Sequence, residues 1–153
     1  MADAKWLTKR EDRAWRGFLL MAGQIQARVA GELQRETGLS DADYAVLVPL
    51  SESKDGRLRP VELGCGINWE KSRLSHHLAR MEERGLVKRT ACVTDRRGAF
   101  VALTAAGRRA IEKAAPKHVE HVRKAFFDAL TPQQIDALAE ISDAVLANLE
   151  NMS

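Results

Sequence analysis

Hydrophobic residues recur at three- and four-residue steps along most of this chain, the spacing that places side chains on one face of an α-helix. The pattern runs from Thr8 to Gly38, resumes at Ser40, and covers two further stretches that begin at Thr104 and Thr131. Near the middle it gives way to two short β-forming runs, Leu86-Val87 and residues 100–103. The chain is therefore predicted to be mainly helical, with a few short strands.

Short polar motifs indicate where these helices begin and end. Capping motifs open three of them: Thr8 with Glu11, Ser40 with Asp43, and Thr131 with Gln134. Gly38 and Gly85 suit helix ends, and Pro60 suits the first turn of a short third helix. Asn68 suits a left-handed position before the fourth helix. Pro116 is expected to kink or break the helix that runs from Thr104 to Leu130.

The helix between Asn68 and Gly85 separates apolar from polar positions. Leu74, His77, Leu78 and Met81 fall on the inner side, where His77 is expected to be a packed core histidine. The two β-forming runs then flank a basic turn, Asp95-Arg96-Arg97-Gly98. This order predicts a winged helix-turn-helix, which places one helix in the DNA major groove and a loop against the backbone or minor groove.

Charge supports a nucleic-acid partner only through its distribution. The 153 residues carry a formal net charge of +3, with 45% hydrophobic and 29% charged residues, which is typical of a globular protein. Residues 57–97 contain ten Lys or Arg and five Asp or Glu, a local net charge of +5. A basic region on a nearly neutral chain is what contact with phosphates requires.

Two motifs resemble those of the MarR/SlyA family of bacterial transcription regulators: R-M-E-E-R-G-L-V-K-R at 80–89 and D-R-R-G-A-F-V-A-L-T-A-A-G at 95–107. The resemblance implies a mainly α, winged α+β fold: two helices, a short strand, two helices, the two wing strands, and two helices. It also implies one MarR-like unit over 1–153, with a DNA-binding lobe at 40–104 and dimerisation helices at 5–38 and 105–150. Such proteins bind a palindromic operator as homodimers, and many repress genes until a small aromatic molecule binds.

The candidate site residues fall into three groups. The candidates on the recognition helix are Lys71, Ser72, Arg73, Ser75, His76 and Arg80. Those in the wing are Asp95, Arg96 and Arg97. The candidates for contact with the DNA backbone are Arg57, Arg59, Lys88 and Arg89. By position, Ser72, Arg73 and His76 match the family's base contacts, Arg97 its minor-groove arginine, and Asp95 the carboxylate that holds it. The chain departs from the family at the cap residue Glu70, with little consequence, and at His76, so that the operator sequence cannot be predicted. Arg80, Glu82, Glu83 and Arg84 also fit an ordinary solvated helix face.

Trp15, Phe18, Leu19 and Tyr44 would border the effector pocket of such a protein. Aromatic residues at helical spacing also fit a packed core, and that alternative stays open.

Other chemistry is weakly supported. His118 and His121 lie three residues apart, but the first two helices offer no His or Cys, so no metal and no other cofactor is expected. Cys65 and Cys92 are expected to be partly buried thiols, with a redox switch as the alternative. No phosphate loop or nucleophile motif indicates an enzyme. A redox- or metal-responsive regulator and a winged-helix protein-interaction module remain alternatives.

No apolar run approaches the roughly 20 residues of a membrane span, and the amino terminus lacks the pattern of a signal sequence. The protein is accordingly expected in the cytoplasm, away from membranes.

Overall fold

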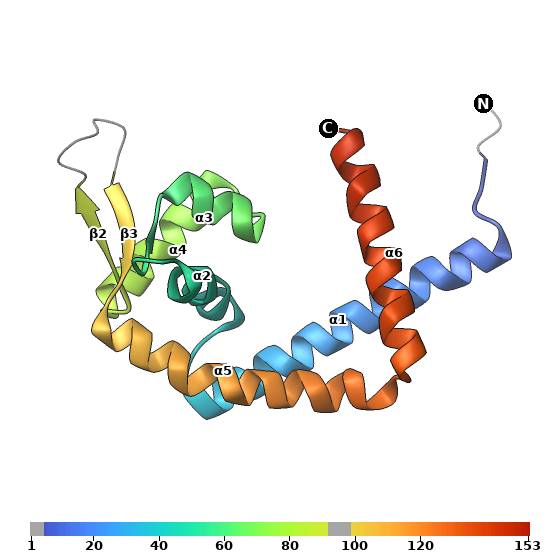
Figure 1. Ribbon diagram of the computed structural model, residues 1–153, viewed down its shortest axis with the longest axis horizontal. Coiled ribbons are helices and arrows are strands. Elements are labelled where there is room, and N and C mark those ends of the chain that lie inside the picture. The colour runs from blue at the N-terminus through green and yellow to red at the C-terminus, as the bar shows by residue number, and fades with distance from the viewer. Residues whose placement is uncertain (1–4, 92–98) are drawn as a thin grey trace. The chain divides into compact units, whose positions relative to one another are not determined.

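The computed structural model describes residues 5–91 and 99–153, which form two compact units. The terminal unit comprises Met1–Val29 with Val119–Ser153, and the central unit comprises Ala30–His118. The elements, in chain order, are α1 (Lys9–Thr37), α2 (Asp41–Glu52), β1 (Arg57–Leu58), α3 (Pro60–Ile67), α4 (Lys71–Glu83), β2 (Val87–Ala91), β3 (Ala99–Leu103), α5 (Ala105–Ala125), the 3-10 turn η1 (Phe127–Ala129) and α6 (Pro132–Asn151). The predicted mainly helical fold with a small sheet is confirmed (Figure 1).

Helix boundaries follow the capping motifs. At the start of α1, the Thr8 amide donates to Glu11 Oε2 at 2.7 Å, and the Glu11 amide donates to Thr8 Oγ1 at 3.2 Å. The same reciprocal bonds open two further helices: Ser40 with Asp43 at α2, and Thr131 with Gln134 at α6. Because each pair satisfies amides that have no partner within the helix, these starts could be read from local sequence.

The sheet is antiparallel, with strand order β1-β3-β2. Figure 1 shows β2 and β3 side by side, as expected for the two wing strands. Their register runs from Val87 opposite Leu103 to Ala91 opposite Ala99. β2 excludes Leu86 of the predicted run Leu86-Val87 and extends past Val87, because pairing with β3 continues through polar residues that carry no hydrophobic signal.

The end of β3 is held against the start of β2 by Thr104 and Gly107. The Thr104 hydroxyl lies 2.6 Å from the carbonyl oxygen of Gly85 and 3.0 Å from that of Leu86, and it accepts the Gly107 amide at 2.9 Å. A Cβ built on Gly107 would overlap the Leu86 carbonyl oxygen. The L-T-x-x-G motif is therefore a packing requirement, since only glycine lets the first turn of α5 approach this strand.

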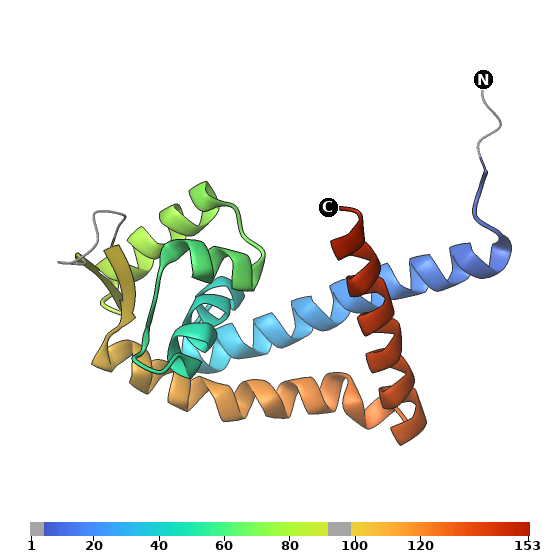
Figure 2. The same cartoon turned by 45° about the horizontal axis from the view of Figure 1, so that its top comes forward.

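A single hydrophobic core fills the central unit, where Figure 2 shows α2, α3 and α4 grouped beside the strands. Each fully buried aliphatic side chain contributes about 1.5–3 kcal/mol relative to exposure. The helical face predicted from sequence supplies much of it, with Leu74, Leu78 and Met81 at most 2% exposed. The core residues are Leu33, Leu39, Val46, Leu47, Leu50, Leu63, Leu74, Leu78, Met81, Val87, Val101, Ile111 and Ala114.

The terminal unit presents large apolar side chains to solvent. Along α6 no residue is buried, and Ile141, Val145 and Leu149 are each more than half exposed. α1 and the end of α5 border a groove of about 350 Å³ in this unit. Its lining residues are Gly17, Leu20, Met21, Gln24, Ile25, Ala125, Phe126, Ala129 and Leu130.

Two expectations were wrong, and one of two alternatives for Pro116 is excluded. α5 is not broken at Pro116, since buried Ile111 and Ala114 hold the preceding turns against the core. The helix ends at Ala125 rather than at Leu130, because the chain turns through η1 before the cap of α6. Cys65 is exposed rather than partly buried, because it lies on the outer side of α3. Cys92 lies outside the described residues.

No helix in the described parts of the chain is both long and apolar enough to cross a membrane.

Candidate DNA interface

Every recognition-helix candidate lies on the exposed surface of α4. The inner positions Leu74, His77, Leu78 and Met81 are buried, so the division between polar and apolar sides is confirmed. The exposed candidates are Lys71, Ser72, Arg73, Ser75, His76 and Arg80. α4 therefore displays basic and hydrogen-bonding side chains while its opposite side belongs to the core.

The turn into α4 is set by backbone geometry. Asn68 adopts the left-handed conformation, with φ of 55°. The Trp69 amide then donates to the Gly64 carbonyl at 2.9 Å. A Cβ on Gly64 would lie 3.2 Å from the Trp69 carbonyl oxygen, so this close approach favours glycine. Glu70 takes the cap position without a side-chain capping bond, and no acidic residue occupies the first turn of α4.

A buried ion network ties α4 to α2. The Asp43 side chain is 1% exposed, and its two oxygens lie 2.9 and 2.8 Å from Nη1 of Arg84. His77 Nε2 lies 3.0 Å from Asp43 Oδ1. Arg80 Nη2 lies 3.3 Å from His77 Nδ1. The buried carboxylate thus holds the C-terminal half of α4 at two points.

Electrostatics in this network favour a charged Asp43 and a neutral His77. Burial raises the pKa of Asp43, but hydrogen bonds from Ser40 and Arg84 outweigh burial, so the pKa lies below its ordinary value. Burial lowers the pKa of His77 despite the neighbouring Asp43. Because arginine only donates, His77 Nδ1 accepts from Arg80, and Nε2–H donates to Asp43. The assigned tautomer agrees with a neutral ring.

Aromatic rings lie under three of the candidate arginines. Arg73 Cζ is 3.9 Å from the ring centroid of Trp69. Arg57 and Arg59 both lie over the Phe100 ring, with Cζ atoms 4.6 and 5.0 Å from its centroid. Trp69 and Phe100 were not selected from the sequence. Trp69 lies before the cap of α4, so helical spacing did not point to the first pair, although the two residues are only four apart in sequence.

The β2 candidates Lys88 and Arg89 are exposed. Arg89 also joins β2 to α4: its amide donates to Glu82 Oε2 at 2.8 Å, and its Nη2 donates to the Ser75 carbonyl at 3.2 Å. The structure thus brings the predicted residues Ser75 and Arg89 together. The predicted wing residues Asp95, Arg96 and Arg97 lie outside the described residues.

A groove of about 400 Å³ lies between α3, α4 and β2. Lys71 and Arg89 supply its cationic side chains, and exposed Cys65 lies on its wall. The remaining lining residues are Pro60, Val61, Gly64, Trp69, Leu74, Ser75 and Leu78. This groove was not expected from the sequence, because its walls come from segments that are separate in the chain.

The residues expected around an effector lie in both units. Trp15, Phe18 and Leu19 of the terminal unit are each at least half exposed, so they do not belong to a core within this chain. Trp15 and Phe18 have ring centroids 6.0 Å apart. In the central unit, Tyr44 stacks on His118 with centroids 4.2 Å apart.

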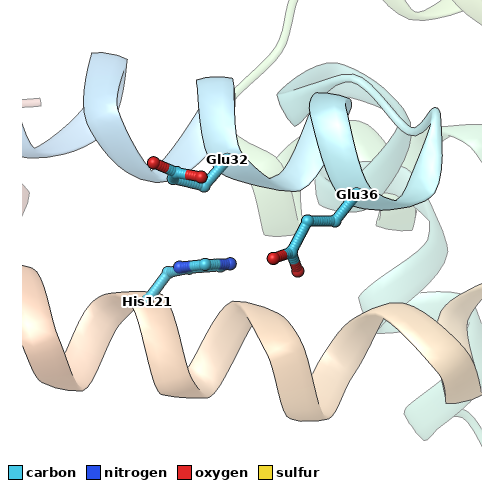
Figure 3. A group of neighbouring side chains, drawn as sticks. All are labelled: Glu32, Glu36 and His121. Atoms are coloured by element: carbon cyan, nitrogen blue, oxygen red, sulfur yellow. The ribbon is translucent and has the colours of Figure 1, made fainter.

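The first two helices contain no His or Cys, but α1 carries carboxylates, which can also bind metal ions. Glu32 and Glu36 lie one turn apart and point to the same side of α1 (Figure 3). Glu32 pairs with Arg35, and Glu36 Oε2 lies 3.5 Å from Lys117 Nζ.

Comparison with known proteins agrees with this geometry. A sequence profile described as the MarR family matches residues 39–98. The chain is 38% identical to AbsC, a MarR family transcriptional regulator from Streptomyces coelicolor, with a TM-score of 0.91 over 97% of this chain and 99% of that one. It is 41% identical to Sco3205 of the same organism, solved in complex with DNA, with a TM-score of 0.90 over 95% and 91% of the chains.

A curated relative, the HTH-type transcriptional repressor YetL of Bacillus subtilis, is 31% identical over 85 residues. That match covers 56% of this chain and about half of the relative, 51% of its length. The two structural relatives match nearly end to end, and they share the winged helix and the terminal helices described above. The chain belongs to the MarR family of transcriptional regulators.

Proposed function

We propose that this protein is a homodimeric repressor that binds a palindromic operator through α4 and the wing. The observation that carries the proposal is the exposed row of basic and polar side chains on α4, held against α2 by the buried Asp43–Arg84 pair. The similarity to Sco3205, which was solved with DNA, supports the same use of this surface. The name of YetL supports repression as the sign of regulation.

The side chains of α4 divide into base-reading and phosphate-binding groups. Arg73 suits bidentate contact with guanine O6 and N7, and Ser72 and His76 suit further base edges. Lys71, Ser75 and Arg80 would support the helix along the groove. Phosphate contacts would come from Lys71 and from four cations outside α4: Arg57, Arg59, Lys88 and Arg89.

The wing would add a minor-groove contact. Arg97 occupies the position of the family's minor-groove arginine, and Asp95 would orient its guanidinium before DNA arrives. Arg96 would meet phosphate or solvent. Arg97→Ala is expected to abolish operator binding at physiological salt without changing the circular dichroism spectrum.

Dimerisation would use the terminal unit. Its exposed apolar residues on α1 and α6 form surfaces too large to be left in water, and a second copy would cover them. A two-fold dimer places two α4 helices about one helical turn apart, so half-sites should lie about 10 base pairs apart.

A small aromatic anion is the proposed effector, bordered by Trp15, Phe18, Leu19 and Tyr44. Such a ligand would weaken operator binding by preferring a form of the dimer that does not fit DNA. The whole cycle would take place in the cytoplasm, where the operator lies.

The proposal is tested with DNA selected by the wild-type protein from a random duplex library, beside a scrambled duplex of equal length. Affinity for both is measured by fluorescence anisotropy at two salt concentrations. Arg73→Ala is expected to cost about 1–3 kcal/mol on the selected duplex and to lower selectivity. Equal losses on both duplexes would refute the base contact. Failure of the library to yield a preferred sequence would favour a protein-interaction module instead.

A further inference from the structure

Arg73, the proposed base-reading arginine, lies across the face of Trp69. The distance of 3.9 Å from Cζ to the ring centroid is that of a guanidinium stacked on an indole. Trp69 is half-buried and packs against the core, whereas Arg73 is exposed. The ring is therefore a fixed support beneath a side chain that would otherwise sample many rotamers.

The backbone of Trp69 and one neighbouring ring position the indole. The Trp69 amide is bound to the Gly64 carbonyl, directly after left-handed Asn68. The Trp69 and His77 rings pack in a T-shaped arrangement, with centroids 5.6 Å apart and an interplanar angle of 79°. His77 is itself bonded to buried Asp43 at 3.0 Å. The orientation of Trp69 thus follows from the same buried network that positions α4.

Stacking leaves the hydrogen-bonding edge of the guanidinium available. Within the described residues, Arg73 makes no ion pair or hydrogen bond, and the short Cζ–centroid distance of 3.9 Å fits a guanidinium that meets the ring with its face. The five N–H donors of arginine lie in the plane of the guanidinium and point away from that face. A group held by its face can donate to guanine with little further loss of rotamer entropy, whereas an arginine held by a carboxylate would first have to break that bond.

We propose that Trp69 is a specificity-determining positioning residue: its indole holds the Arg73 guanidinium in the orientation that reads a base, without touching a base itself. The inference rests on the proposed base contact of Arg73. It assigns Trp69 a role beyond filling the core, and it connects sequence selectivity to the buried Asp43–His77 pair through the packing of the Trp69 and His77 rings.

The test is a double-mutant cycle between Trp69 and Arg73, with affinities measured on the selected and scrambled duplexes. Trp69→Leu is expected to weaken binding to the selected duplex about fivefold, the effect of losing one partly exposed cation–π contact. Binding to the scrambled duplex should be unchanged. In the Arg73→Ala background, Trp69→Leu should have no further effect, because the side chain that it positions is gone.

Trp69→Phe retains an aromatic face and is expected to retain most of the selectivity, since phenylalanine binds cations less strongly than tryptophan but does bind them. If Trp69→Leu fails to fold, as judged by thermal unfolding, the same cycle is measured with Trp69→Phe, where a smaller coupling to Arg73 must still be found. Val61→Ala, at an exposed position that lines the same groove, should leave selectivity at the wild-type value.

Equal losses from the Trp69 substitution in both backgrounds would show that the residue acts through stability alone, and the inference would be wrong. That result would leave the proposed function intact, provided that Arg73→Ala by itself lowers selectivity. If Arg73→Ala weakens binding to both duplexes equally, the proposed base contact of Arg73 is itself wrong. The single Arg73 variant thus tests the proposed function, and the double-mutant cycle tests the role of Trp69.

Discussion

One nitrogen of Arg84, Nη1, lies within 2.9 Å of both carboxylate oxygens of Asp43, a residue that precedes it by 41 positions. Asp43 also completes the capping box of α2 with Ser40. A single buried side chain therefore determines both where α2 begins and where α4 lies against it. The Arg84 side chain is 45% exposed, so one end of the pair is solvated and the pair avoids the full cost of burying two charges.

Asp43→Ala is expected to destabilise the central unit by about 3 kcal/mol, because it removes the cap of α2 and leaves Arg84 and His77 without their partner. Denaturant unfolding followed by circular dichroism measures this loss. Asp41→Ala, in the same first turn but not buried, is the matched control and should cost less than about 1 kcal/mol. Similar losses from both substitutions would mean that the buried network contributes little.

The free energy of unfolding should decrease in mild acid, because His77 binds a proton more readily in the unfolded chain. The pKa of this residue is lowered in the folded protein, so below about 6.5 the unfolded chain binds a proton that the folded chain does not. Stability is therefore highest above the unfolded pKa and decreases as pH falls toward the folded one. Protonation would also place a donor at Nδ1 opposite Arg80.

His77→Gln should flatten the dependence of the thermal midpoint on pH between about 7.5 and 5.5, because a neutral amide has no proton to gain. His76→Gln, at the exposed neighbouring position, should retain the wild-type slope. A wild-type slope in His77→Gln would assign the acid sensitivity to other groups.

Gly107→Ala should cost about 2–3 kcal/mol, because the added Cβ meets the Leu86 carbonyl oxygen and neither backbone can easily move. Gly31→Ala is the control: it lies within α1, where a Cβ meets nothing within 4 Å. That change should raise stability by up to about 1 kcal/mol, as expected for alanine in a helix. Urea unfolding of both variants gives the comparison, and equal effects would contradict the close approach.

Lys88→Ala should weaken binding to the selected and scrambled duplexes alike and reduce the slope of log affinity against log salt by about one unit. The reason is that the ammonium group of an exposed lysine on β2 attracts phosphates but does not distinguish one base from another. Anisotropy titrations at several salt concentrations provide the slope. A loss confined to the selected duplex would instead make Lys88 a base contact.

Val145→Asp combined with Leu149→Asp should convert the dimer to a monomer, because both side chains are about half exposed in the single chain and their proposed cover is a second copy. Ala147→Asp places an aspartate on the opposite face of α6 and should leave the dimer intact. Light scattering at micromolar concentration distinguishes the two masses; a monomeric wild-type protein would refute the dimer directly.

Local signals were sufficient for most of the fold. Thr8, Ser40 and Thr131 make the capping bonds that the sequence predicted, and Asn68 has the left-handed backbone expected of it. These features depend on neighbours within four residues. Pro116 shows the limit of such reasoning, because contacts of the preceding turns with the core override a local preference against the helix.

The candidate site was predicted less completely. α4 and its polar side followed from periodicity, but Arg84 was read as part of a solvated face because its partner lies 41 residues away. Likewise, Phe100 lies beside Arg57 and Arg59 only because β1 pairs with β3 in the sheet. Nothing in a single sequence reports such distant pairs. The missing part of the site is therefore the set of contacts that orient the arginines, rather than the arginines themselves.

The shortness of β1 has a kinetic consequence. This strand has two residues, and its pairing partners on β3 lie more than 40 positions later in the chain. Closing so long a loop for so few hydrogen bonds is unfavourable until β2 and β3 have paired. β1 should therefore dock late in folding and open early, exchanging its amide hydrogens sooner than β3. Arg57 and Arg59 would reach their positions over the Phe100 ring only in this final step.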